Sequence, residues 1–309
     1  MTLPVSIVVA TRNRAESLRR TLRSIVAQTE LPAELIVVDT SSDAATKELC
    51  EADPLRGTRT RYIKSSIAGA AAQRNQGVAS ATEPVIWFID DDIIFEADCV
   101  ERLWQALKSD PEIGGVNAMI MNQCYQPPGS MSRVMFTLMH GRYEKSFAGK
   151  VIGPAVNLLP ADHDDLPEVV PVEWLNTTCT MYRREALPDS PFPRQFTGYS
   201  LMEDVALSVE VGKCWKLANA RTARIFHDSQ PADYKSDQRL LSCTELANRH
   251  FVMTMIMGKR RLRDYLKLAL WELFSLASLL ATKNGRANLS FVLAGKWDGL
   301  RRIFSKGSP

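Results

Sequence analysis

The chain has 309 residues, of which 45% are hydrophobic and 24% charged, and these proportions are those of a folded globular protein. Its net charge of +3 is unevenly spread, since residues 259–309 hold 11 Lys and Arg against 3 Asp and Glu, while residues 1–258 hold 27 against 32. A basic tail on an acidic body argues against a nucleic-acid-binding surface across the fold and predicts that residues 259–309 meet an anionic surface.

Cysteine usage and the N-terminus indicate the compartment. The six cysteines form no C-x-x-C pair, which disfavours a zinc site or a disulfide framework and is typical of a reducing cytoplasm. The apolar run Val5–Ala10 is too short for a signal peptide and is followed at once by charged residues. We therefore predict a cytoplasmic protein, peripheral on the inner face of a membrane if the basic tail meets lipid.

Short apolar runs alternate with amphipathic stretches over the first 120 residues. Several of the apolar runs are long enough and apolar enough to be buried on both faces, which predicts an α/β fold with a mostly parallel sheet flanked by helices. The predicted strands are 5–10, 34–39, 60–64, 85–89 and 116–121, and the predicted helices are 15–28, 44–52, 70–79 and 96–108.

The pattern weakens over residues 122–171, which favours either binding loops or elements that the pattern fails to identify. Regularity returns with a predicted strand over 174–182, a helix over 201–211 and a strand over 223–227. Everything beyond residue 234 has a helical pattern.

Polar side chains follow three of the predicted strands. Thr11–Arg14 follows the first, Asp39 the second, and Asp90-Asp91-Asp92 the strand 85–89. The carboxyl ends of parallel strands meet at one edge of a sheet, where ligands bind. Three adjacent carboxylates after a buried strand repel one another, and a divalent cation such as Mg²⁺ or Mn²⁺ relieves that cost. The alternative is a surface turn that caps the next helix.

Four segments together resemble the successive motifs of family 2 glycosyltransferases with the GT-A, Rossmann-like fold, and the similarity covers about the first 230 residues in order and spacing. The resemblance implies a catalytic domain over 1–230, with nucleotide-sugar binding over about 1–120 and the acceptor side over about 121–230, and a helical, basic-amphipathic extension over 231–309. The four segments are Val5–Arg14, Glu34–Asp43, Gly69–Gly77 and Val85–Asp92.

The resemblance also implies a nucleotide-sugar site at the strand ends. By position in the motifs, Thr11 and Asp39 would contact the nucleoside, with Asp39 accepting a hydrogen bond from a pyrimidine N–H. Arg74 would lie beside the base or the phosphates, and Asp90 near the ribose. Judged alone, Asp39 is also suited to start a turn and Arg74 to be a solvated helix residue.

The last member of the triplet, Asp92, would bind the divalent metal, Mn²⁺ or Mg²⁺. His227 ends a predicted strand; a single His is more often structural, but in some family members a His at this point completes the metal shell. Asp91 is grouped with the nucleotide-sugar-binding residues, its own role open because the usual family triplet is D-x-D. Arg14 would meet the diphosphate or pair with Glu16.

A second acidic pair, Glu203-Asp204, starts the predicted helix 201–211. Acidic residues in a first turn also favour the helix dipole. The pair matches the family's E-D motif, which supplies the catalytic base of inverting members, so the resemblance assigns Asp204 as the base that deprotonates an acceptor hydroxyl. Glu203 would bind substrate or position the helix, and Trp174 would face the acceptor sugar or belong to the core.

Residues 265–281 form an apolar stretch of 17 residues that contains Lys267 and Glu272, and this is short of the roughly 20 needed to span a bilayer. On a helix, five residues share one side: Leu262, Leu266, Leu273, Ala277 and Leu280. With the flanking basic residues, this pattern favours either a helix lying in an anionic membrane surface or one packed on the catalytic domain or on a second copy in a homodimer.

We therefore predict an inverting, metal-dependent glycosyltransferase of the EC 2.4 class, which moves a sugar from a UDP- or dTDP-sugar to a hydroxyl of a glycan or lipid-linked saccharide. The alternative is a nucleotide-sugar-binding or membrane-associated scaffold with the same fold and no turnover. A nicotinamide dehydrogenase is disfavoured, because no G-x-G-x-x-G follows the first strand.

Overall fold

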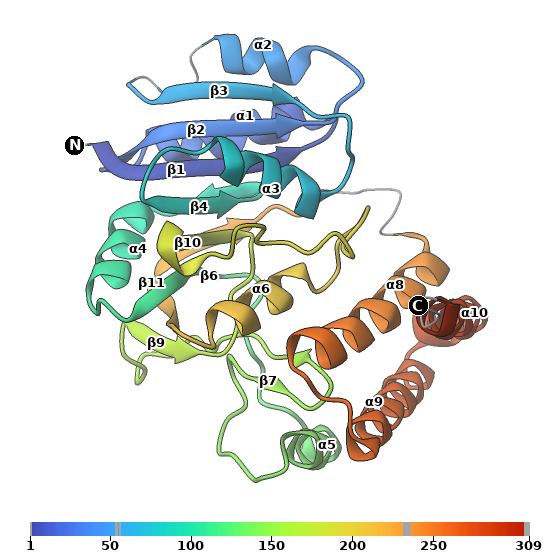
Figure 1. Cartoon of the computed structure of the whole chain (residues 1–309). Helices are drawn as coiled ribbons and strands as arrows, with labels where there is room; N and C mark the ends of the chain where they lie inside the picture. Colours follow the sequence, from blue (N-terminus) through green and yellow to red (C-terminus); the bar gives the residue numbers. More distant parts are fainter. Residues whose placement is uncertain (1, 53–54, 56, 231–235, 306–309) are drawn as a thin grey trace. The chain divides into compact units, whose positions relative to one another are not determined.

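The computed structural model describes residues 2–52, 55, 57–230 and 236–305. The chain forms two compact units (Figure 1). Unit 1 comprises Met1–Tyr125, Ala148–Lys150 and Leu159–Gln230, and unit 2 comprises Gln126–Phe147, Val151–Leu158 and Pro231–Pro309. The chain therefore enters unit 2 before unit 1 is complete, an arrangement that the sequence pattern did not indicate.

Unit 1 is built on one sheet in the strand order β3-β2-β1-β4-β10-β6-β11-β5, with β9 paired to β11. The strands β3, β2, β1 and β4 are parallel, and β10 runs antiparallel to both β4 and β6. The mixed α/β class with a central, mostly parallel sheet is thus confirmed. The strands are β1 Thr2–Thr11, β2 Leu31–Asp39, β3 Arg59–Lys64, β4 Val85–Ile89, β5 Ile93–Phe95, β6 Ile113–Ile120, β9 Val169–Val172, β10 Cys179–Arg183 and β11 Lys216–His227.

Helices cover both faces of this sheet (Figure 1). On one face α1 contributes Leu18 and Leu22 to a core that includes Trp87, which is fully buried. On the other face α3 comes close to β1 at Gly77, where an added Cβ would lie 2.3 Å from Val8 Cγ1, so only glycine permits this approach. The helices of unit 1 are α1 Ala15–Val26, α2 Ala45–Glu51, α3 Ala70–Ser80, α4 Cys99–Lys108, the 3₁₀ turn η1 Arg184–Ala186 and α6 Glu203–Val211.

Two predicted elements begin later than expected. The strand predicted over 174–182 begins at Cys179, because the preceding segment turns against α6, where the Leu175 N–H donates to Ser208 Oγ at 2.9 Å. The helix predicted over 96–108 begins at Cys99, because the short strand β5 precedes it. The segment 122–171, for which loops and unidentified elements were both left open, contains both: loops separate α5 Ser130–His140, the hairpin β7 Val151–Ile152 and β8 Val156–Asn157, and β9.

Unit 2 is mainly helical, as the pattern beyond residue 234 predicted. Its small apolar core joins Leu246, Met253 and Leu268, with Ile303 packed against them. No helix among the described residues is both long enough and apolar enough to cross a membrane. Besides α5, its helices are α8 Gln238–Phe251, the π-helix η2 Val252–Ile256, α9 Leu262–Leu280 and α10 Lys283–Ser305.

Candidate active site

The parallel strands β1, β2 and β4 end at one edge of the sheet, as the sequence predicted. Thr11 is the register partner of Asp39, and Val9 that of Ile89, so the residues that follow each strand emerge side by side. The Asp90 N–H donates to Thr178 O at 3.0 Å, which extends the pairing of β4 with β10 to the start of the acidic triplet.

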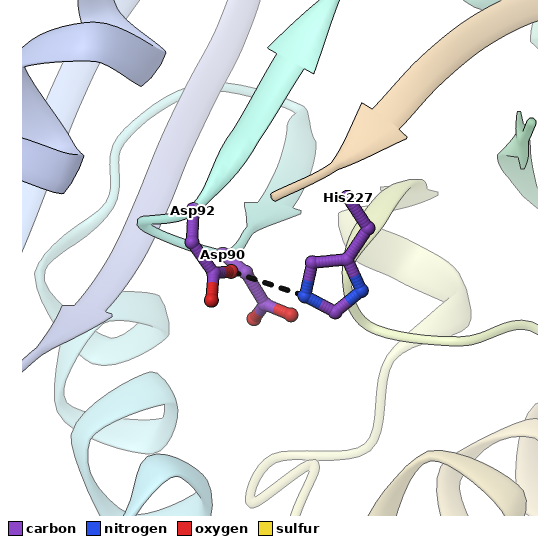
Figure 2. Close-up of side chains that lie close together, drawn as sticks. All are labelled: Asp90, Asp92 and His227. Carbon is purple, nitrogen blue, oxygen red and sulfur yellow. Dashed lines mark hydrogen bonds and ion pairs between the residues drawn. The ribbon is translucent and has the colours of Figure 1, made fainter. Parts of the chain in front are cut away.

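His227 reaches the triplet through strand pairing. It ends β11, where it is the register partner of Ile93 in β5, directly after Asp92. The Asp228 N–H donates to Asp92 O at 2.8 Å and extends this pairing. A residue far along the chain thereby lies beside the triplet (Figure 2).

Asp90, Asp92 and His227 form a cluster able to hold a metal ion. One ligand atom from each lies within 4.8 Å of the others, and His227 Nε2 is 3.1 Å from Asp92 Oδ1. Two carboxylates and one imidazole suit a divalent cation such as Mn²⁺, and an ion held by three protein ligands keeps positions for oxygens of a substrate. The donor set therefore fits the predicted metal.

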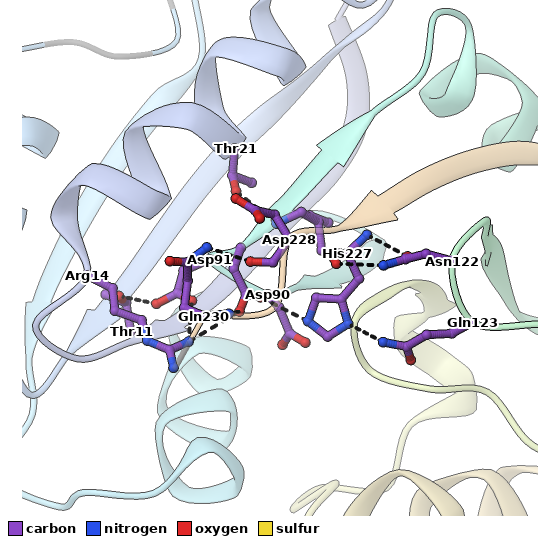
Figure 3. Close-up of polar contacts among 12 residues, drawn as sticks. Thr11, Arg14, Thr21, Asp90, Asp91, Asn122, Gln123, His227, Asp228 and Gln230 are labelled. Carbon is purple, nitrogen blue, oxygen red and sulfur yellow. Dashed lines mark hydrogen bonds and ion pairs between the residues drawn. The ribbon is translucent and has the colours of Figure 1, made fainter. Parts of the chain in front are cut away.

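Two neighbouring amides hold His227 in place (Figure 3). The Asn122 side chain donates to the His227 carbonyl at 3.0 Å and accepts from its N–H at 3.1 Å. The Gln123 side-chain nitrogen Nε2 lies 3.1 Å from His227 Nδ1. A metal on Nε2 requires the imidazole proton on Nδ1, and the Gln123 amide can accept that proton only with its oxygen turned toward the ring. The sequence pattern missed both residues, since neither belongs to an acidic or metal-ligand motif.

Asp92 remains ionised despite its burial. Burial alone would raise its pKa, but the hydrogen bond and charge of His227, the N–H of Gln230 and the charge of Arg14 outweigh burial and lower the pKa. The Gln230 N–H donates to Asp92 Oδ2 at 3.2 Å, and Arg14 Nη1 lies 3.3 Å from the same oxygen. A permanently charged carboxylate is what a metal ligand requires.

Asp91 points away from the metal cluster. Thr11 Oγ1 donates to its Oδ2 at 2.6 Å, and Arg14 Nη1 donates to its Oδ1 at 3.2 Å. Burial raises the pKa of Asp91 to about 6, although these two partners oppose the rise. Asp91 thus connects the triplet to Thr11 at the end of β1.

Arg74 joins the two acidic groups that the sequence treated separately. Its Nη2 lies 2.8 Å from Asp90 Oδ1, and its Nη1 lies 3.0 Å from Glu203 Oε1. The guanidinium is buried and also lies over the Phe192 ring, 5.9 Å from its centroid. The two carboxylates keep the pKa of Arg74 raised even though burial lowers it. The metal cluster and α6 are therefore linked by one permanently charged side chain.

Asp204 lies in the first turn of α6, next to Glu203. Its Oδ1 accepts from the Val205 N–H at 2.7 Å, and its carbonyl accepts from Ser208 Oγ at 2.7 Å. Burial raises the pKa of Asp204 to about 6, and burial with the charge of Asp204 raises the pKa of Glu203. The raised pKa of Asp204 makes its carboxylate suited to accept a proton near neutral pH. The neighbouring Glu203 is held by the Arg74 cation.

Asp39 is fully buried at the end of β2. Its Oδ1 accepts from the Ser41 N–H at 2.8 Å and from the Ser41 hydroxyl, and its Oδ2 accepts from Tyr62 Oη at 2.9 Å. Burial and Asp39 together raise the pKa of Tyr62 to about 12, so its hydroxyl stays a donor. Tyr62 was not among the predicted site residues; its position in β3 beside Asp39 follows from strand order.

Trp174 is buried in the segment that precedes β10, and its place on an acceptor surface stays a prediction. The other predicted residues fall into three groups. Ion pairs and hydrogen bonds join Thr11, Arg14, Asp91, Asp92 and His227. Arg74 joins Asp90 and Glu203, with Asp204 adjacent in α6, and Asp90 lies within 4.8 Å of the first group at the metal-binding cluster. Asp39 is held by Ser41 and Tyr62.

Comparison with known proteins bears on the same part of the chain. Residues 6–149 match the family model described as Glycosyl transferase family 2. The glycosyltransferase GlyA of Streptococcus pneumoniae serotype 4 is 32% identical over 103 residues, which cover 33% of this chain and 15% of GlyA. The matched stretch thus spans a small part of that relative's length.

Two solved structures resemble the fold. The mannosyltransferase PcManGT from Pyrobaculum calidifontis, in complex with GDP-Man and Mn²⁺, superposes with a TM-score of 0.57 at 16% identity, over 96% of this chain and 87% of that one. GalNAc-T7 with UDP, GalNAc and Mn²⁺ superposes with a TM-score of 0.53 at 16% identity, over 72% and 43%. At such identities the likeness concerns the fold.

Proposed function

The chain belongs, through residues 6–149, to glycosyltransferase family 2, and from that premise we propose that it transfers a sugar from a nucleoside-diphosphate donor to a hydroxyl group with inversion at the anomeric carbon. One observation carries the proposal. Arg74 connects the metal-binding cluster at Asp90 with the acidic helix start at Glu203 and Asp204, so a donor site and a proton acceptor lie in one network.

The residues Asp90, Asp92 and His227 would hold the divalent ion of the donor complex. Imidazole favours Mn²⁺ over Mg²⁺, which prefers oxygen ligands, and we propose Mn²⁺ as the ion. When bound, the ion would neutralise negative charge on the departing diphosphate. The presence of Mn²⁺ with the nucleotides of PcManGT and GalNAc-T7 supports this choice.

Asp204 is the proposed general base. The acceptor oxygen forms a bond to the anomeric carbon while the bond from that carbon to the diphosphate oxygen breaks, and the electron pair leaves with the diphosphate. The hydroxyl proton passes to the Asp204 carboxylate. Glu203 is held by Arg74 at 3.0 Å, so it is a positioning residue for the helix start rather than a second base.

The nucleobase is proposed to bind at Asp39 and Tyr62. Each carboxylate oxygen can accept two hydrogen bonds, and Oδ2 of Asp39 accepts one from Tyr62. Because Asp39 is fully buried, a pyrimidine N–H would reach Oδ2 only after neighbouring side chains move. Uracil and thymine both carry that N–H, so the proposed donor is a UDP- or dTDP-sugar. Arg14, beside Asp91 and Asp92, is the proposed cation next to the diphosphate.

The proposed acceptor is the hydroxyl of a glycan or of a lipid-linked saccharide, on the side of the site that α6 and Trp174 border. An acceptor attached to lipid would be met at a membrane surface, and the basic residues of 259–309 favour an anionic one.

The donor proposal is tested by nucleotide binding. Calorimetry of UDP, dTDP and GDP with and without Mn²⁺ is expected to show that the metal tightens binding of UDP or dTDP, and that Asp92→Ala removes this metal effect. Asp110→Ala, which changes an Asp whose partner is the exposed Lys216, is the matched control and should keep it. Wild-type binding that does not respond to the metal contradicts the proposed metal site.

The base is tested by turnover. Asp204→Asn is expected to bind the donor as wild type does but to release nucleoside diphosphate from a panel of nucleotide sugars and acceptors about 10²–10⁴-fold more slowly. Glu210→Gln, in the same helix and paired with exposed Lys213, is the control. Wild-type protein that binds the nucleotide but turns over no member of the panel would instead be a binding scaffold.

A further inference from the structure

Helix α9 exposes several leucines to solvent, whereas its Lys267 and Glu272 face the rest of unit 2. Leu266 and Leu273 are 61% and 63% exposed, whereas the Glu272 side chain is 13% exposed. Glu272 pairs with Lys296 at 2.7 Å, and Lys267 Nζ donates to Met139 O at 2.6 Å. The exposed side is the one that the sequence pattern predicted to be apolar: Leu262, Leu266, Leu273, Ala277 and Leu280 are all exposed, and Leu270 is exposed too.

Helix α5 adds a second exposed apolar stripe next to α9. The two helices are joined by Phe136 and Trp271, whose ring centroids are 6.3 Å apart. Met131, Val134 and Leu138 recur at helical spacing on α5, and all three are exposed. In unit 1, by contrast, the exposed large hydrophobic side chains among the described residues are few: Val26, Ile67, Met121, Tyr199 and Phe226. An exposed apolar helix face of this kind marks a surface that meets a partner.

Helix α10 carries the residue types found at a lipid–water interface. Trp297, Leu300 and Phe304 are exposed, and they recur at helical spacing with Arg301. The Arg301 guanidinium lies over the Trp297 ring, 5.3 Å from its centroid. Aromatic rings with neighbouring cations are typical of helices that lie at a membrane surface.

The charge that unit 2 presents to solvent is basic. Its C-terminal acidic residues are occupied internally: Asp298 pairs with Arg239 at 2.6 Å, and Asp264 accepts from the Arg261 N–H at 2.9 Å. The exposed basic residues near the ends of α9 and on α10 are Arg260, Arg261, Arg263, Lys283, Arg286 and Arg301. A second copy of the chain would bring these like charges together, whereas an anionic surface pairs with them.

We propose that unit 2 docks on an anionic lipid surface through the exposed leucines of α9, flanked by the basic residues at the helix ends. With 19 residues, α9 is roughly 28 Å long and would lie in the plane of the surface rather than across it. Docking on lipid would bring the site to a lipid-linked acceptor, so this role rests on the proposed function.

The test is binding of the full-length chain to vesicles. Co-sedimentation is measured with phosphatidylcholine alone and with about one third phosphatidylglycerol, at low and at high salt. Binding is expected to be at least about ten-fold tighter to the anionic vesicles and to weaken with salt. The double variant Leu266→Asp with Leu273→Asp is expected to lose about ten-fold or more, since it places charge in the apolar face.

The control introduces the same two charges in unit 1. Val26 and Ile67 are 51% and 56% exposed, so Val26→Asp with Ile67→Asp matches the variant in charge and exposure and should bind vesicles as wild type does. All substituted side chains are exposed, so folding is retained, and circular dichroism checks this. Equal loss in both double variants would mean that added negative charge alone explains the effect and would overturn the proposal.

Two further outcomes would also overturn it. One is wild-type chain that binds neither kind of vesicle. The other is a dimer in analytical ultracentrifugation that Leu266→Asp with Leu273→Asp dissociates, with no vesicle binding, which would assign the face to a second copy. Metal-dependent nucleotide binding is measured separately on the same proteins, so failure of the lipid surface and failure of the donor site are distinguishable.

Discussion

The two units differ in what they place inside. Unit 1 buries leucine, isoleucine and tryptophan between its sheet and helices and keeps most of its ion pairs at the surface or at the edge of the sheet. Unit 2 has a small apolar core beside an ionic network of Glu245, Arg249, Glu272 and Lys296, and it exposes the leucines of α9. In unit 1 apolar burial accounts for the fold, whereas in unit 2 part of the apolar surface is left for a partner.

The largest expected effect concerns the ionic interior of unit 2. Lys296→Met leaves Glu272 and Glu245 without one cation in a site where the Lys296 side chain is 13% exposed, and is expected to destabilise unit 2 by about 2–4 kcal/mol. Hydrogen exchange of the α9 and α10 amides measures it. Lys213→Met removes a pair of similar length, 2.6 Å, from an exposed site in unit 1 and should cost about 0.5 kcal/mol or less. An equal loss of stability in Lys296→Met and Lys213→Met would remove the distinction between the two units.

The polar network of unit 1 is expected to matter more for binding than for stability. Gln123→Leu removes the amide beside His227 Nδ1, whose oxygen would accept the Nδ1 proton when turned toward the ring, and should weaken Mn²⁺ binding about 10- to 100-fold. Gln123→Glu supplies a stronger acceptor and should retain or tighten binding. Mn²⁺ affinity is read by electron paramagnetic resonance, with Gln105→Leu on the exposed side of α4 as control. If both Gln123 variants bind Mn²⁺ as wild type does, the amide does not position His227.

The pH profile of turnover tests the buried acids of the same network. A carboxyl must be ionised to accept a proton, and burial raises the pKa of Asp204 to about 6, so turnover should rise with pH through that value. Below it the rate falls about ten-fold per pH unit. Because the pKa of Asp91 is also about 6, rates are measured at saturating donor and metal. An acid limb near pH 4, the ordinary aspartate range, would contradict the assigned environment of Asp204.

The smallest expected effect lies on the exposed face of α9. Leu273→Ser removes an apolar side chain that is already largely in solvent and should change stability by about 0.5 kcal/mol or less. The same change in the core of unit 1, Leu103→Ser, removes a fully buried side chain and should cost several kcal/mol. Urea unfolding compares the two. A large loss for Leu273→Ser would mean that α9 buries this face within the chain.

The parallel half of the sheet was predictable because its signals are local. The apolar runs mark the strands, and the polar residues at their ends, Thr11, Asp39 and Asp90, mark the edge that the strands share. The pairing of His227 with Ile93 was not predictable from the sequence, because β5 is three residues long and follows the acidic triplet directly. No residue pattern of that length distinguishes a strand from a turn.

The side chains that support the site were the least predictable. Asn122, Gln123 and Tyr62 belong to no motif, and their roles arise from contacts between segments far apart in the sequence. The place of Arg74 beside the base or the phosphates stays a prediction, and the structure adds that Arg74 bridges Asp90 and Glu203. Such a bridge depends on how α3 and α6 are arranged, which single-residue patterns do not report. The apolar face of α9 was identified from the sequence, which left open whether that face is exposed or packed.

Residues 126–147 and 151–158 belong to unit 2 although unit 1 continues after them, and this affects where the protein can be shortened. Helix α5 precedes the acidic helix α6 in the chain, yet its ring Phe136 and the carbonyl of Met139 are partnered by Trp271 and Lys267 of α9. A chain ended after residue 230 would therefore keep α5 while losing the residues that cover it. The inserted part of unit 2, residues 126–147 and 151–158, and its terminal part, residues 231–309, therefore have to be kept or replaced together.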